Sequence, residues 1–115
     1  MREIRFRGKS EHTGEWIYGF GIGKNEDGVW IQTRIDDYSF VYENTIGQFT
    51  GFFDCEGNEI YEGDVIYHEK QGKRRVYYPF DERTACFALE NIENGMRSYL
   101  ENTFLYKKIG DIHDK

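Results

Sequence analysis

Two acidic residues, Glu62 and Asp64, flank a single glycine inside a stretch of alternating apolar residues. Side chains two residues apart lie on the same face of a β-strand, so a strand over residues 60–68 would present both carboxylates together. Paired carboxylates hold divalent cations for hydrolysis, and Asp36 and Asp37 form a second acidic pair. Acidic residues beside tight turns also hydrogen-bond the turn backbone, and this role is favoured at both places. We therefore predict no catalytic residue, and a metal-dependent hydrolase stays an alternative.

The other side chains that ligate metals or act as nucleophiles are scattered along the chain. No two of the histidines and cysteines lie within two to five residues of each other, the spacing typical of a zinc site. The set consists of His12, His68, His113, Cys55 and Cys86. No serine lies in a G-x-S-x-G motif, and no glycine cluster matches a phosphate-binding loop. The sequence predicts no metal ligand and no cofactor, and its two isolated cysteines indicate a reducing compartment.

Two clusters of cationic residues indicate a different function. They consist of Arg2, Arg5, Arg7 and Lys9, and of Lys70, Lys73, Arg74 and Arg75. The first cluster, 2–9, is expected on the solvated face of a strand and the second, 70–75, in a loop followed by two tyrosines. Cations beside aromatic rings are typical of surfaces that bind single-stranded nucleic acid. The net charge of −6 argues against a general binder of phosphate backbones. Nucleic-acid binding is therefore kept as an alternative.

Alternating apolar and polar residues predict β-strands along the first half of the chain. The expected strands span residues 1–8, 16–23, 29–35 and 38–43. Gly19, Gly21 and Gly23 share one face of the second strand, where the chain can bend sharply or admit a backbone or a ring. The pair Asp27-Gly28 predicts a hairpin between the second and third strands.

The second half is expected to contain more turns. Residues 45–51 are predicted to form a turn or one helical turn, and Gly57-Asn58 a second turn. The strand over 60–68 is expected to bulge or kink at 62–64. Further strands are expected at 76–80, 96–100 and 104–109, after a basic loop at 69–75. Residues 81–94 fit a strand or a helix, with the strand favoured, and Asn94-Gly95 predicts a turn.

Composition favours the same fold class. The 115 residues suit one domain over 1–115, with possible subdomains 1–50 and 51–115 that share a core. Nine tyrosines, nine phenylalanines and two tryptophans favour strands over helices, and thirteen glycines imply many tight turns. We therefore expect a mainly β protein of small antiparallel sheets and hairpins, with at most one or two short helical turns. Closure into a small barrel is an option.

Three regions of the chain combine several residue types at fixed offsets. They are the opening, 2–8 and 14–19, the centre, 46–51 and 57–65, and the closing segment, 109–113. Together they resemble the YopX family of phage and prophage proteins. The resemblance implies a small, mostly β protein inside a bacterial cell, with no cofactor and no catalytic residue to carry over. Residues 67–105 depart from the family pattern. A weaker likeness of 59–80 to the first hairpin of SH3-like barrels makes such a barrel an alternative for the second half.

The expected function is that of a phage or prophage accessory protein acting as a non-catalytic protein-binding module. This expectation rests on the many tyrosines and the tryptophans, residue types that often anchor interfaces, and on the lack of a catalytic motif in the sequence. The partner is an unknown protein, and pairing of two copies through edge strands is compatible with this function. The charged start lacks a signal peptide, and no stretch approaches the roughly 18 apolar residues that span a membrane. The expected location is the bacterial cytoplasm.

Overall fold

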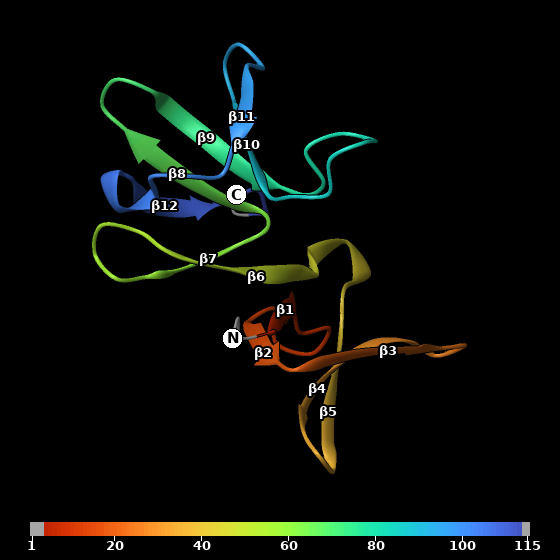
Figure 1. Ribbon diagram of the computed structural model, residues 1–115. Helices are drawn as coiled ribbons and strands as arrows, with labels where there is room; N and C mark the ends of the chain where they lie inside the picture. The colour runs from red at the N-terminus through yellow and green to blue at the C-terminus, as the bar shows by residue number, and fades with distance from the viewer. Residues whose placement is uncertain (1–3, 114–115) are drawn as a thin grey trace. The chain divides into compact units, whose positions relative to one another are not determined.

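The computed structural model describes residues 4–113 and confirms the mainly β prediction. Over these residues it contains twelve strands and two 3-10 turns, with no α-helix (Figure 1). The chain divides into two compact units, Met1–Phe49 and Thr50–Lys115. Among the described residues, no helix is long and apolar enough to cross a membrane.

The first unit contains two groups of antiparallel strands. Its elements are β1 (Phe6–Lys9), β2 (Trp16–Gly19), β3 (Gly21–Asn25), β4 (Gly28–Arg34), β5 (Asp37–Val41), η1 (Glu43–Thr45) and the start of β6 (Gly47–Phe53). β1 pairs with β2 on one side and with the first residues of β6 on the other. β3, β4 and β5 form a three-stranded sheet in that order. The buried apolar residues of this unit include Val29, Ile31 and Val41.

The single strand expected over residues 16–23 is two strands, β2 and β3. The break lies at Phe20, whose N–H donates to the carbonyl of Gln32 at 3.0 Å. Gly19 therefore approaches β4 so closely that an added Cβ would lie within 3.0 Å of the Gln32 backbone. The predicted bend is confirmed, and its cause is the close approach of two backbones, which only glycine allows.

The turn expected at 45–51 is wrong beyond its first residue. Glu43–Thr45 forms the short 3-10 turn η1, and β6 begins at Gly47. Thr45 fixes this junction, because its hydroxyl accepts a hydrogen bond from the Lys9 N–H at 2.8 Å and donates to the Tyr42 carbonyl at 2.6 Å. Gly47 and Gly51 both lie in β6, and of the two Gly51 has a left-handed φ of +86°.

The second unit is built on one five-stranded antiparallel sheet. Besides the end of β6, its elements are β7 (Glu59–Tyr61), β8 (Asp64–His68), β9 (Gly72–Tyr77), β10 (Ala88–Asn91), β11 (Arg97–Tyr99), η2 (Thr103–Leu105) and β12 (Lys107–Asp111). The strand order is β11-β10-β9-β8-β12, so β11 and β12 are edges (Figure 1). The sheet is open, and the closed SH3-like barrel considered for the second half is not formed.

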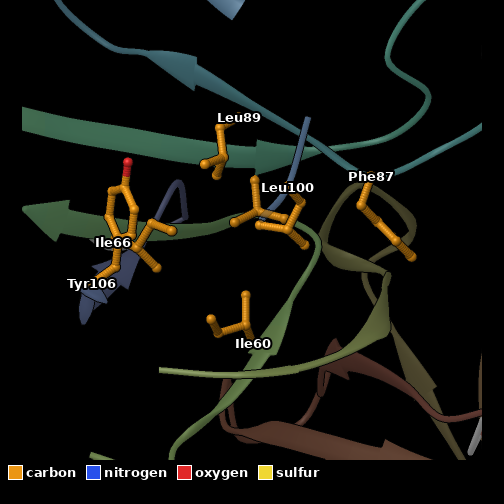
Figure 2. Close-up of a cluster of buried hydrophobic side chains, with 7 residues drawn as sticks. Ile60, Ile66, Phe87, Leu89, Leu100 and Tyr106 are labelled. Atoms are coloured by element: carbon orange, nitrogen blue, oxygen red, sulfur yellow. The ribbon is translucent and has the colours of Figure 1, made fainter. Parts of the chain in front are cut away.

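A cluster of buried side chains packs in the second unit (Figure 2). Its members are Ile60, Ile66, Val76, Phe87, Leu89, Leu100 and Tyr106. They come from β7, β8, β9, β10, the loops beside β10 and β11, and the residue between η2 and β12, so elements far apart in the sequence share one core. Val76 and Leu89 are paired across β9 and β10, and each is 1% exposed.

Several expected boundaries in this unit are corrected. The strand over 60–68 is interrupted by a turn at Glu62-Gly63, where Gly63 has φ +96°, so the expected kink separates β7 from β8. The basic loop expected at 69–75 is shorter, because β9 begins at Gly72. The strand interpretation of 81–94 is confirmed for β10 alone, and the predicted Asn94-Gly95 turn links β10 to β11.

Candidate interaction surface

Three aromatic rings lie together on one face of the β3-β4-β5 sheet. Trp30 pairs with Phe40 across β4 and β5. Tyr38 comes two residues before Phe40 and therefore lies on the same face of β5. The ring centroids are 5.5 Å apart for Trp30 and Tyr38, 5.9 Å for Trp30 and Phe40, and 5.7 Å for Tyr38 and Phe40. Tyr38 is 56% exposed, and the other two are half-buried. We call these three residues the aromatic face.

Glycines on β3 determine how far this face extends. Gly23 lies directly opposite Trp30, and a Cβ at Gly23 would overlap the indole ring. The Trp30 ring therefore lies across the backbone of β3, where a larger residue would displace it. Gly21 lies opposite Gln32, the next residue of β4 on this side. The predicted close approach of a ring to this glycine strand is thus confirmed at Gly23.

The two outer edges of the sheet differ within the first unit. The edge of β5 is covered by residues 9–11: the Glu11 N–H donates to the Phe40 carbonyl at 3.1 Å, and Ser10 forms a bridge with Val41. β3 is the other end of the sheet, and no strand of this unit's described residues pairs with its outer edge. The ring of Trp30 lies over that strand. An extended segment added to β3 would therefore contact Trp30 as well as the free backbone groups.

The turns at both ends of β4 are acidic. Glu26 and Asp27 form the turn between β3 and β4, Asp36 lies in the turn between β4 and β5, and Asp37 is the first residue of β5. Figure 1 shows the three strands that these turns join. Gln32 stabilises the second turn, since its side-chain amide donates to the carbonyls of Arg34, Ile35 and Asp37. The break predicted at Asp36-Asp37 is confirmed, since the turn ends at Asp36 and β5 begins at Asp37. The aromatic face lies between two pairs of carboxylates, which repel phosphate and attract cationic side chains.

The predicted carboxylate pair is separated in the structure. Glu62 lies in the turn after β7, whereas Asp64 is completely buried at the start of β8. Asp64 accepts a hydrogen bond from the Tyr61 N–H at 2.7 Å and lies 3.2 Å from Lys108 Nζ. The predicted role of Asp64, to accept a hydrogen bond from the turn backbone, is confirmed. The expectation that one strand presents both carboxylates together is wrong, because Asp64 is buried where β8 pairs with β12.

The first basic cluster is stacked on aromatic rings. The Arg7 guanidinium lies 3.9 Å from the Trp16 ring centre and Arg5 lies 4.8 Å from that of Phe49. Arg7 is 1% exposed, so the cationic outer face expected for the first strand is wrong at this residue. Lys9 also lies over Trp16, at 5.1 Å. Arg2 lies outside the described residues. These cations stabilise the fold of the first unit.

The second basic cluster is divided between the two faces of β9. Arg75 pairs with Glu90 at 2.7 Å, and Arg97 pairs with the same carboxylate at 3.1 Å. These two arginines lower the pKa of Glu90 through hydrogen bonds and charge attraction. Arg74 points to the opposite face, where its guanidinium donates to Ser98 Oγ at 2.8 Å. The continuous cationic loop that would favour nucleic acid is therefore not formed.

The scattered histidines and cysteines stay apart. Within residues 4–113, no three His, Cys, Asp or Glu side chains gather in a metal-binding geometry. Cys55 is exposed and Cys86 half-buried, and both are free thiols.

Asp54 organises the turn that the sequence indicated by Gly57-Asn58. Its carboxylate accepts backbone hydrogen bonds from Glu56, Asn58 and Lys108.

The aromatic face itself was not recognised as a site from the sequence. The alternation of Trp30 and Gln32, and of Tyr38 and Phe40, indicated strands, but the register that brings the rings together depends on the bulge between Gln32 and Arg34. Glycine at position 23 was the available signal for a ring packed on β3.

A family model described as YopX protein matches residues 5–115, nearly the whole chain. No curated protein sequence matches the chain.

Proposed function

The chain belongs to the YopX family, and on that premise we propose that it is a non-catalytic protein-binding module. The observation that carries the proposal is the aromatic face of Trp30, Tyr38 and Phe40 beside the outer edge of β3. Aromatic residues are the side chains that most often anchor interfaces, because they bury a large area at a low entropic cost.

The partner proposed for this surface is a protein that contributes an extended, net-positive segment. The backbone of β3 offers main-chain hydrogen bonds to an added strand, and Trp30 offers a ring to its side chains. The acidic turns at 26–27 and 36–37 attract lysine and arginine at both ends of that segment. The same carboxylates disfavour nucleic acid, which requires cations beside the rings. Phage or prophage origin and action in the bacterial cytoplasm belong to this proposal, and the family resemblance supports them.

Capture of bacterial proteins by the wild type and by two surface variants tests the proposal. Tyr38→Arg would place a cation between the acidic turns and remove an exposed ring, and Tyr99→Arg changes an equally exposed tyrosine of the second unit. We expect proteins captured by the wild type from bacterial lysate to be lost with Tyr38→Arg and retained with Tyr99→Arg. Their release should need high salt, because charge attraction contributes.

Three outcomes would contradict the proposal. They are equal capture by wild type and Tyr38→Arg, tight salt-dependent binding of single-stranded DNA or RNA by the wild type, and self-association through β3 that leaves no surface for another protein. Sizing of the free protein and a nucleic-acid titration at low ionic strength measure the last two.

A further inference from the structure

A cavity of about 320 Å³ opens in the second unit, on the same side of the sheet as the buried core. It is distinct from the aromatic face, which belongs to the first unit. Residues from β8, β9, β10, β11 and the η2 region line it. Those that matter for its chemistry are His68, Arg74, Leu89, Ser98, Glu101 and Tyr106. Its size is that of a site for a small molecule.

Arg74 is a cation on the apolar face of the sheet. It lies directly opposite Ile66, and Val76 follows two residues later on the same side of β9. Ile66 and Val76 are both core residues with exposed fractions of 0% and 1%. Lys73 and Arg75, the neighbours of Arg74, point to the other face. The guanidinium is thus held at the end of the core, where the cavity begins.

The partners of Arg74 are neutral. Its Nη1 donates to Ser98 Oγ at 2.8 Å and its Nη2 donates to Gln71 Oε1 at 3.3 Å. No carboxylate among residues 4–113 pairs with it, whereas Arg75 and Arg97 share Glu90. Ser98 and Gln71 use two of the five N–H groups of the guanidinium and orient it without neutralising its charge. A partly buried cation without a counter-charge is complementary to an anion.

The other residues that line the cavity indicate that the anion has an apolar body. Leu89 is buried at the inner end of the cavity and Tyr106 is 5% exposed. Figure 2 shows the Tyr106 ring beside Ile66, with its hydroxyl end pointing away from Ile60. The His68 ring packs against Tyr106 with centroids 5.5 Å apart. An apolar body would contact Leu89 and these rings while a charged end reached Arg74.

We propose that this cavity binds a small organic monocarboxylate, with its carboxylate on Arg74 and its apolar body on Leu89 and Tyr106. One planar guanidinium matches the geometry of a carboxylate. A phosphate, with more charge and more acceptor oxygens, is usually bound by several cations or backbone N–H groups. Glu101, at the exposed rim, adds repulsion against a second negative charge.

Titration of the full chain with phenylacetate tests the site. We expect chemical-shift changes in ¹H–¹⁵N spectra at Ser98, Asn102 and the Arg74 Nε–H, with a dissociation constant of about 1 mM, the range of a single charged contact. Arg74→Met keeps an unbranched stem at this position and removes the charge, and should weaken binding about tenfold or more, the loss of one charge-assisted pair. Lys73→Met removes a charge from the opposite face of the sheet and should change binding less than about twofold.

Matched ligands separate the chemistry from general affinity. Benzylamine carries the opposite charge, and inorganic phosphate carries no apolar body. Each is added at the concentration at which phenylacetate occupies half of the sites, and neither should shift the same signals. A dispersed spectrum of Arg74→Met verifies that the variant is folded. The proposal is overturned if phenylacetate leaves the cavity signals unchanged, if benzylamine or phosphate shifts them equally, or if folded Arg74→Met binds phenylacetate as the wild type does.

Discussion

Alanine at Gly19 should destabilise the first unit, whereas alanine at Gly21 should not. Gly19 ends β2 and Gly21 begins β3, and the two positions differ in what a methyl group would meet. At Gly19 the new Cβ would lie 2.5 Å from Ile31 Cγ2 and closer still to the Gln32 carbonyl oxygen. At Gly21 the nearest atom is the Cβ of Gln32 at 3.6 Å, an ordinary contact.

The magnitude follows from what must move. The Gln32 carbonyl is a backbone atom of the central strand β4 and accepts the Phe20 N–H, so it has no free rotation that relieves the clash. Overpacking costs about 1–3 kcal/mol, and loss of the hydrogen bond adds about 1 kcal/mol. We expect Gly19→Ala to lower the free energy of unfolding by about 3 kcal/mol. Gly21→Ala should change it by less than about 1 kcal/mol, with a gain from reduced freedom of the unfolded chain.

Urea unfolding followed by tryptophan fluorescence measures both variants. Trp16 and Trp30 are the two tryptophans of the chain, and both lie in the first unit, so the signal reports on that unit. Equal midpoints for Gly19→Ala and the wild type would refute the close approach of β2 and β4. An equal decrease in the free energy of unfolding for Gly19→Ala and Gly21→Ala would show that the loss of glycine's backbone freedom, and not the clash with Gln32, destabilises the unit.

Three further results are expected in the second unit. Burial acts to raise the pKa of Asp54, but the hydrogen bonds from Lys108, Asn58 and Glu56 outweigh it and hold the pKa below 3.8. The unfolded carboxyl therefore takes up its proton first, stability is lost as pH falls below about 3.8, and urea melts should show a smaller acid loss in Asp54→Asn. The pKa of Glu90, measured by NMR, should rise towards 4.5 when Arg75→Met removes its nearest cation; an unchanged value would contradict the pairing. Ile66→Ala should cost about 2–5 kcal/mol by far-UV circular dichroism, and a loss below about 1 kcal/mol would place Ile66 outside the core.

The sequence predicted the type of most elements in the first unit. Alternation and the Asp27-Gly28 signal identified the β3–β4 hairpin, and the glycines of 19–23 indicated a close approach. The faces were harder to assign. Arg7 was expected in solvent because arginine is usually exposed, yet it is buried against Trp16. A cation–π contact between separate strands leaves no trace in a hydrophobic pattern.

Turn positions in the central segment were less predictable, because glycine is compatible with both a turn and an extended strand. Gly63 lies in a turn with φ +96°, whereas Gly47 lies inside the pairing of β1 and β6. The environment of Asp64 depends on that turn and on β12, which lies more than forty residues later. Arg74 lies on the apolar face because it pairs with Ile66 in the β8–β9 hairpin. The sequence therefore indicated strands and candidate groups, but not which groups meet.

Site-specific photo-crosslinking from the aromatic face tests the proposed binding function most directly. Benzoylphenylalanine replaces Tyr38 in one protein and Tyr99 in another, and both are expressed in bacterial cells before irradiation. The proposal predicts a protein adduct from position 38 and none from position 99. A protein adduct from position 99 alone, or an adduct of position 38 that is destroyed by nuclease, would contradict it.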